Sequence, residues 1–195
     1  MSEILENLFG SRARARMLRL FLLNPEREYS IAEAAKRNML KVADAKREIK
    51  NFKKINFITE KTRKRKKFYR LNPDFILQPE LKSLVAKSSA YPQCQGLKKI
   101  RSIGNVKLAV VSGIFLDYPK SKADMILAVD NVNRRKLKNL ISGIEAELGR
   151  EIKYVLMSSE ELKYRVNMMD RFILDFVKGP HNKIINKIKI KGFEV

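Results

Sequence analysis

The run Phe57-Ile58-Thr59-Glu60-Lys61-Thr62-Arg63-Lys64-Arg65-Lys66-Lys67-Phe68-Tyr69-Arg70-Leu71 places six cations between two apolar segments. Within residues 61–67 only Thr62 is uncharged. Taking an unpaired charge out of water is costly, so this block must project into solvent or onto an anion. The flanking residues 57–60 and 68–71 are typical of strands. The run therefore predicts a β-hairpin whose basic tip is residues 61–67.

Two helices are expected upstream. The first covers residues 11–23, with Ser11 as its N-cap and Asn24-Pro25 as its end. Its apolar residues recur at helical spacing with arginines opposite them: Ala13, Met17, Leu20 and Phe21. The second begins at Ser30, which forms a capping-box pattern with Glu33. The inward-facing residues of this second helix are expected to be Ile31, Ala34 and Ala35.

A third helix is expected over residues 41–54. Its apolar stripe consists of Val42, Ala45, Ile49 and Phe52. The outward positions are mostly basic, which also fits a solvated face on an ordinary helical bundle. The adjoining basic hairpin favours another interpretation, because a helix-turn-helix followed by such a hairpin is the order of a winged helix that binds DNA.

These two basic elements define the expected DNA interface. The third helix would enter the major groove, where Arg47 and Lys50 could reach guanine edges. The hairpin, residues 57–71, would contact the phosphate backbone or the minor groove. The expected set is Lys41, Asp44, Lys46, Arg47, Lys50, Lys61, Arg63, Lys64, Arg65, Lys66 and Lys67. The expected partner is double-stranded DNA.

Composition limits the other function classes. The 195 residues carry a formal net charge of +21, which attracts DNA, RNA or an acidic membrane alike. No apolar run of about twenty residues and no cleavable signal pattern occur, so a cytoplasmic protein without a membrane partner is expected. Cys94 and His181 are the only residues of their types, which excludes an internal disulfide and a Cys/His zinc site.

The second half of the chain predicts an α/β arrangement. Small and turn-forming residues from 88 to about 96 mark a boundary between domains at 1–90 and 91–195. Strands are expected over 106–111, 125–129 and 152–157, the first two central in a sheet. Helices are expected over 132–148, from Ser158 and over 172–177. The tail through Ile184, Ile185, Ile188 and Ile190 fits an edge strand, a short helix or both. The overall class is α+β.

Several segments together resemble a family of prokaryotic winged-helix regulators fused to a nucleotidyltransferase-like domain. They are Leu8-Phe9-Gly10-Ser11-Arg12-Ala13-Arg14, the basic hairpin, Asn72-Pro73-Asp74, Pro79-Glu80-Leu81 and the half ending in Gly179-Pro180. The resemblance spans nearly the whole chain. It implies that the second domain is similar to the minimal nucleotidyltransferases of the DNA polymerase beta superfamily. Active members of that superfamily use Gly-Ser to cradle a triphosphate and Asp-x-Asp to hold two Mg²⁺ ions.

This chain departs from that pattern. Gly113 matches the motif glycine, but Ile114 replaces the serine. Asp124 matches the first carboxylate, and Ile126 replaces the second. Asp117 falls where relatives often have arginine, and the third strand offers Lys153 and Tyr154 in place of a further acid. One carboxylate cannot bridge two hard cations. We therefore expect no catalysis, no metal and no cofactor, with Asp124 as a capping or surface acid.

The sequence thus favours a DNA-binding regulator of transcription. One alternative is a nucleotidyltransferase with a divergent metal site built on Asp124 and on Asp117 or Asp130. Another is a non-specific nucleic-acid-binding protein, which the net charge suits equally well. The second domain would be a scaffold, a dimerisation surface or a ligand sensor. A homodimer on paired half-sites fits the winged-helix interpretation, although no residue pattern requires one.

Overall fold

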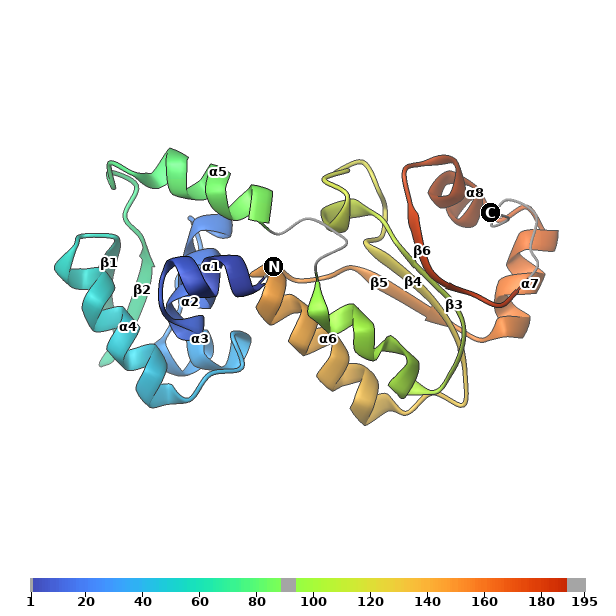
Figure 1. The fold of residues 1–195 in the computed structure, drawn as a ribbon, viewed down its shortest axis with the longest axis horizontal. Coiled ribbons are helices and arrows are strands. Elements are labelled where there is room, and N and C mark those ends of the chain that lie inside the picture. Colours follow the sequence, from blue (N-terminus) through green and yellow to red (C-terminus); the bar gives the residue numbers. More distant parts are fainter. Residues whose placement is uncertain (1, 89–93, 189–195) are drawn as a thin grey trace. The chain divides into compact units, whose positions relative to one another are not determined.

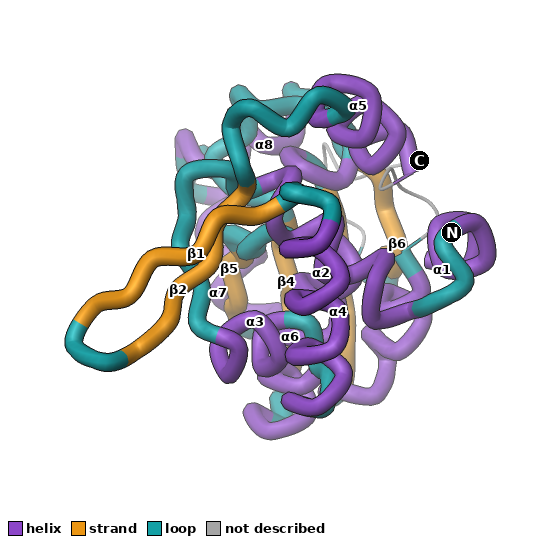
Figure 2. The backbone as a smooth tube through the Cα atoms, turned by 90° about the vertical axis from the view of Figure 1, so that its left-hand side faces the viewer, coloured by secondary structure: helices purple, strands orange, loops and turns teal. Residues whose placement is uncertain are grey.

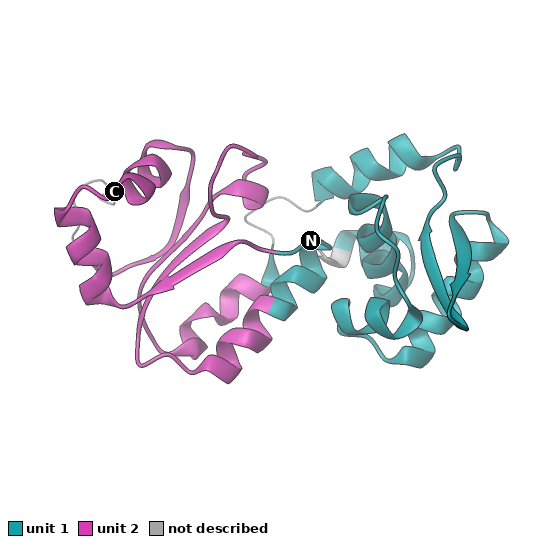
Figure 3. Cartoon of the chain, turned by 180° about the vertical axis from the view of Figure 1, so that it is seen from behind, with its two compact units in different colours: residues 1–89, 93–95, 142–151 teal, residues 90–92, 96–141, 152–195 magenta. Residues whose placement is uncertain are grey.

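The computed structural model describes residues 2–88 and 94–188 and has a mixed α+β architecture (Figure 1; Figure 2). The chain divides into two compact units (Figure 3). Unit 1 comprises Met1–Ser89, Gln93–Gln95 and Ser142–Glu151, and unit 2 comprises Ala90–Pro92, Gly96–Ile141 and Ile152–Val195. The expected boundary at residue 90 lies in the segment 89–93, outside the described residues. The sequence did not predict that Ser142–Glu151 packs with unit 1.

Unit 1 is mainly helical. Its elements are α1 (Ser2–Leu8), α2 (Arg12–Leu23), α3 (Ile31–Arg37), α4 (Val42–Lys54), β1 (Ile58–Arg63), β2 (Lys66–Leu71) and α5 (Gln78–Ser88). Both predicted N-caps are confirmed: the hydroxyl of Ser11 accepts from the Arg14 amide and that of Ser30 from the Glu33 amide, each at 3.2 Å. These caps satisfy amides that the first helical turn leaves without a partner.

The hairpin has longer strands than the sequence predicted. β1 and β2 pair antiparallel from Ile58↔Leu71 to Arg63↔Lys66, so most of the expected seven-residue tip is strand. Only Lys64 and Arg65 form the turn, and both have positive φ, of 48° and 61°. Such angles characterise the two-residue turns whose twist matches that of the strands, although Asn-Gly is the usual sequence there. Figure 2 shows the hairpin extending away from the helices of its unit.

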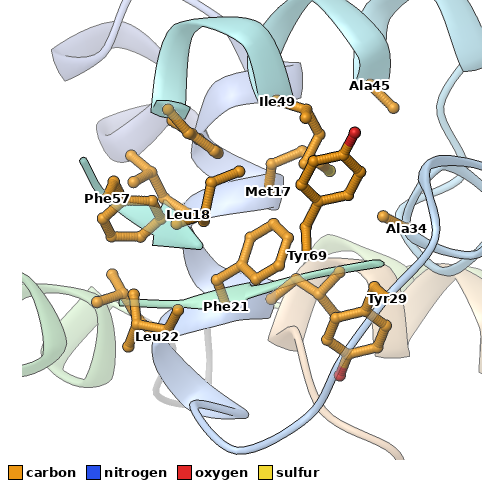
Figure 4. Packing of buried hydrophobic residues seen from close by; sticks show 14 of the residues in the cluster. Met17, Leu18, Phe21, Leu22, Tyr29, Ala34, Ala45, Ile49, Phe57 and Tyr69 are labelled. Carbon is orange, nitrogen blue, oxygen red and sulfur yellow. The ribbon is translucent and has the colours of Figure 1, made fainter. Parts of the chain in front are cut away.

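The core of unit 1 combines aliphatic side chains with aromatic rings (Figure 4). The ring of Phe21 on α2 is fully buried and meets three other rings edge to face. The ring centroids lie 5.7 Å away for Tyr29 and 6.4 Å away for both Phe52 and Phe57. Because these rings come from α4 and from the segments before α3 and β1, Phe21 joins most of the unit.

The prediction that the arginines of α2 lie opposite its apolar face was wrong for Arg16 and Arg19, which are 3% and 2% exposed. Helix α2 packs against α1, α4, α5 and β2, so little of its surface reaches solvent. The Arg16 side chain donates to the Asn38 carbonyl at the end of α3, at 2.7 Å. That of Arg19 donates to the Glu147 carbonyl. Burial lowers the pKa of both guanidinium groups.

The segment Ser142–Glu151 is joined to unit 1 by polar contacts. It contains the end of α6 (Arg134–Leu148) and the residues that follow it. The Asn24 amide donates to the Gly149 carbonyl at 2.8 Å. The Glu151 carboxylate pairs with Arg37 at 2.8 Å and with Arg27 at 3.0 Å. Hydrogen bonds from Arg37 and then Arg27 lower the pKa of Glu151, so it stays ionised.

Unit 2 contains a four-stranded sheet. Its elements besides α6 are η1 (Gln95–Ile103), β3 (Asn105–Val111), η2 (Gly113–Phe115), β4 (Met125–Asp130), β5 (Tyr154–Met157), α7 (Ser159–Asn167), α8 (Arg171–Lys178) and β6 (Asn182–Asn186). The strand order is β5-β4-β3-β6, with β5 parallel to β4 and the other pairs antiparallel. The two strands predicted as central are central. The tail forms an edge strand, and Ile190 lies outside the described residues.

One face of this sheet packs against α7 and α8 (Figure 1). Alternate residues of the strands, Leu108, Val110, Ile126 and Ala128, form a buried cluster with residues of both helices. This alternation is the two-residue period of a strand whose faces are separately covered. Among the described residues, no helix has the length and apolar character needed to cross a membrane.

Phe21→Ala should lower the free energy of unfolding of unit 1 by about 3–5 kcal/mol, because it leaves a cavity among three rings. Hydrogen exchange of the α2 and α4 amides in the full chain measures this loss. Ile76→Ala is the control, since Ile76 is 85% exposed and its truncation should change stability by less than about 0.5 kcal/mol. A loss below about 1 kcal/mol for Phe21→Ala would contradict the assigned core.

Candidate nucleic-acid interface

Helix α4 is fixed by one apolar stripe and one buried carboxylate. Ala45, Ile49 and Phe52 are buried as predicted, whereas Val42 in the first turn is 56% exposed and was wrongly assigned to the stripe. Glu48 is also buried, and sequence analysis missed it. The stripe and this acid together set which face of α4 remains outside.

The Glu48 carboxylate is paired with α2. Its side chain is 2% exposed and accepts from the Arg14 guanidinium at 3.0 Å. The Asn51 amide also donates to Glu48, at 3.4 Å. A second Arg14 nitrogen donates to the Phe9 carbonyl at 3.1 Å. An unpaired buried charge is strongly destabilising, so this contact restrains the rotation of α4 about its own axis.

The outward face of α4 is basic. Lys41, Lys46, Arg47 and Lys50 are exposed, and Asp44 is half-buried. The Arg47 guanidinium lies 3.0 Å from a carboxylate oxygen of Asp44 and 3.7 Å from one of Glu48. Arg47 is thus held by two acids of its own helix. Helical spacing puts Lys46, Arg47 and Lys50 on the side of α4 away from its apolar stripe, whereas Asp44 lies on the flank and Lys41 is the N-cap residue before the helix.

Two glutamates pair with part of the hairpin. All seven residues 61–67 are exposed. Glu28, before α3, lies 3.0 Å from Arg63 and 3.7 Å from Lys61. Glu60, on β1, accepts from Lys67 at 2.7 Å and also pairs with Lys53 in the last turn of α4. Glu60 therefore joins α4 to both strands of the hairpin.

The Lys53 and Lys67 contacts change the acid strength of Glu60. Hydrogen bonds from Lys53 and Lys67 lower its pKa from 4.5 to about 2. Because the folded-state pKa is depressed, the stabilisation is present above pH 4.5 and is lost as the pH falls toward about 2. The same contacts raise the pKa of Lys67. Sequence analysis named the cations here but not the two glutamates that pair with them.

A subset of the predicted cations keeps its charge uncompensated. Within residues 2–88 and 94–188, no ion pair involves Lys41, Lys46, Lys50, Lys64, Arg65 or Lys66. They lie on the outward face of α4 and at the hairpin turn. Such exposed cations can bind phosphate groups without first breaking an ion pair within the protein.

Two residues that the sequence analysis compared with a nucleotidyltransferase motif, Gly113 and Asp124, support the backbone of unit 2. Asp124 is 6% exposed, so it is not a surface acid. Its two carboxylate oxygens accept from the amides of Ile114 at 2.9 Å and Lys153 at 2.8 Å. Gly113 has φ of 52°, and a β-carbon there would collide with the Asp124 carboxylate. This glycine is therefore required by packing against Asp124.

Ile126 and Asp130 also have structural roles. Ile126 is fully buried in the cluster beneath α7 and α8. Asp130 accepts from the amide and hydroxyl of Ser159, both at 2.9 Å, and these bonds lower its pKa. Asp117 is exposed. In the described part of the chain, no group of three or more His, Cys, Asp or Glu residues is arranged to hold a metal ion. The donor set does not fit a two-Mg²⁺ centre.

Comparisons of the chain with protein-family models, curated proteins and solved structures find no significant match.

The ion pairs of Glu60 predict its titration. A carbon-13 NMR titration should give a pKa of about 2 for Glu60. Lys53→Met should raise this pKa toward 4.5, because it removes one of the two hydrogen bonds that depress it. Lys61→Met is the matched control, since Lys61 pairs with Glu28 instead. A Glu60 pKa near 4.5 in the unmodified chain, or equal shifts in the two variants, would contradict the assigned pairs.

Proposed function

We propose that unit 1 is a winged helix that binds double-stranded DNA, and that the protein is a regulator of transcription. In this proposal α4 lies in the major groove and the hairpin, as the wing, contacts the backbone or the minor groove. The observation that carries the proposal is the uncompensated cations at the outward face of α4 and at the hairpin turn. Two basic elements linked through Glu60 are better explained by a polyanion than by solubility.

The order of elements supports this proposal. A winged helix has three helices followed by a hairpin, and α2, α3, α4 and β1–β2 follow that order. The segment between α2 and α3 also pairs with the hairpin: Tyr29 and Tyr69 exchange two backbone hydrogen bonds of 2.8 Å. This bridge anchors the base of the hairpin beside the helices.

Helix α4 has the chemistry of a helix that reads bases. Lys46 and Lys50 are one helical turn apart, so they lie on the same face. Arg47, between them, can give two parallel hydrogen bonds to guanine, the commonest specific contact in the major groove. Its pairing with Asp44 orients the guanidinium before DNA binds. Sequence specificity is assigned to Arg47, and phosphate contacts to the lysines.

In the hairpin, some cations form ion pairs within the protein and others are proposed to contact DNA. Glu28 and Glu60 neutralise cations along the strands, which lowers repulsion within the hairpin. The turn residues Lys64 and Arg65, with neighbouring Lys66, keep their charge for the phosphates. These contacts should make binding strong and salt-sensitive at every duplex sequence.

Unit 2 is proposed to be a non-catalytic domain with the fold of a nucleotidyltransferase. The Asp124 carboxylate is occupied by two backbone amides, and Ile126 gives the core a side chain where a second metal ligand would be needed. A nucleotide-transfer assay with Mg²⁺ or Mn²⁺ tests the enzymatic alternative directly. A nucleotidyltransferase fold would not by itself imply nucleotidyltransferase activity.

The wing assignment predicts a change in salt dependence. Replacing Lys64, Arg65 and Lys66 together by alanine should weaken binding to all duplexes. It should also reduce the slope of log K against log salt by about 2 to 3, if each cation contacts one phosphate. Fluorescence anisotropy of a labelled duplex between about 50 and 300 mM salt measures both quantities.

A matched control separates contact from general attraction. Lys98, Lys99 and Arg101 on η1 of unit 2 are exposed and carry the same charges as the three hairpin residues. Their replacement by alanine should leave the slope nearly unchanged. Equal loss in the two triple variants would mean that only the overall charge attracts DNA, and the wing assignment would fail.

A further inference from the structure

Unit 2 has a pocket of about 320 Å³ that the proposed DNA interface does not use. It lies between the loop before β4 and the end of α8. Its lining is basic and aromatic: Tyr118, Lys120, Ser121, Lys122, Asp175, Phe176, Lys178 and Gly179. Its volume is at the lower end of the range for small-molecule sites, enough for a compact ligand. Gly113 and Asp124 do not line it, although Tyr118 of its wall is hydrogen-bonded to Gly113.

The walls of this pocket are held in place. On one side, the Tyr118 amide donates to the Gly113 carbonyl at 2.9 Å. On the other, the Ser112 hydroxyl donates to the Pro180 carbonyl at 2.6 Å, next to the lining residue Gly179. A β-carbon at Gly179 would lie 3.2 Å from the ring of Tyr118, so glycine lets the two walls approach closely. The pocket is therefore built before any ligand arrives.

The charges of the lining favour an anion. The lining includes three lysines, Lys120, Lys122 and Lys178, and one carboxylate, that of Asp175. Lys122 donates to Asp175 at 2.9 Å, and this bond lowers the pKa of the carboxyl group. Within the described ranges, Lys120 and Lys178 form no ion pair. The pocket thus keeps a net positive charge at neutral pH even though its one acid is ionised.

We propose that this pocket binds a small phosphomonoester, which makes unit 2 a ligand-binding domain. A phosphomonoester carries between one and two negative charges near pH 7, which matches the two unpaired lysines. Lysine binds phosphate as a point charge, without the fixed geometry of arginine. The aromatic walls contributed by Tyr118 and Phe176 would contact the organic part of the ligand. The Ser121 hydroxyl already donates to the Ala123 carbonyl at 2.6 Å, so the lysines must supply most of the attraction.

Phenyl phosphate is a suitable probe, because it joins one phosphate group to one ring. Calorimetry and amide chemical shifts of the full chain should show saturable binding, with shifts at residues 118–122 and 175–179 that share one midpoint. Lys120→Ala combined with Lys178→Ala leaves the Lys122–Asp175 pair intact and should weaken binding at least tenfold. Asp175→Asn should tighten binding severalfold, because it removes the only acid of the lining.

The control must account for the high charge of the chain. Lys64→Ala combined with Lys66→Ala removes the same charge from the hairpin and should change phenyl phosphate affinity less than twofold. Thermal unfolding checks that each variant is folded. Equal weakening in the two double variants, weaker binding by Asp175→Asn, or the absence of saturable binding would overturn the proposal. Duplex binding of the pocket variant is measured in parallel, so that failure of the pocket and failure of the DNA interface are distinguished.

Discussion

The ion pair between the buried Glu48 carboxylate and the partly exposed Arg14 guanidinium is the contact on which the orientation of α4 depends. The Glu48 side chain is 2% exposed, and the Arg14 guanidinium, 3.0 Å away, is the nearest cation to its carboxylate. Ile49 and Phe52 are buried as well, so this pair and the apolar stripe together favour one orientation of α4 against α2. The lysines of α4 then face outward together. The buried side of α4 thus determines which of its side chains are exposed. The basic face is already exposed in the isolated chain.

Glu28 and Glu60 decide which cations of α4 and the hairpin are neutralised by ion pairs and which are not. Glu60 joins α4 to the hairpin through Lys53 and Lys67, and Glu28 holds Arg63. Of the cations predicted for the interface, those without an ion pair in the described residues lie at the turn of the hairpin and on or just before α4. In unit 2, Asp124 has a comparable structural role, because its carboxylate joins η2 and the start of β5 to β4 through two backbone amides. Both units therefore use carboxylates mainly to position backbone or cations.

The spacing of apolar residues and the helix caps predicted much of the fold, because both depend only on residues close together in the sequence. The caps Ser11 and Ser30 and the central strands of unit 2 are observed as predicted, and so is the buried stripe of α4 except for Val42. The failures come from tertiary packing. Arg16 and Arg19 are buried because α2 is covered by neighbours distant in sequence, and Glu48 is buried because Arg14 compensates it. The hairpin strands are longer than predicted because backbone pairing continues between exposed cations. The prediction relied on apolar residues, which are absent from this part of the strands. Of the candidate interface, the cations could be named from sequence, but not the acids that pair with some of them.

The most direct test of the central claim is selection of bound duplexes from a random library by the full chain at near-physiological salt. If α4 reads bases in the major groove, the bound pool will converge on one sequence motif. An inverted repeat with half-sites about one helical turn apart would further indicate a twofold dimer. Tight, salt-sensitive binding without any enriched motif would contradict the claim. The chain would then be a non-specific nucleic-acid-binding protein, whose affinity comes from its charge alone.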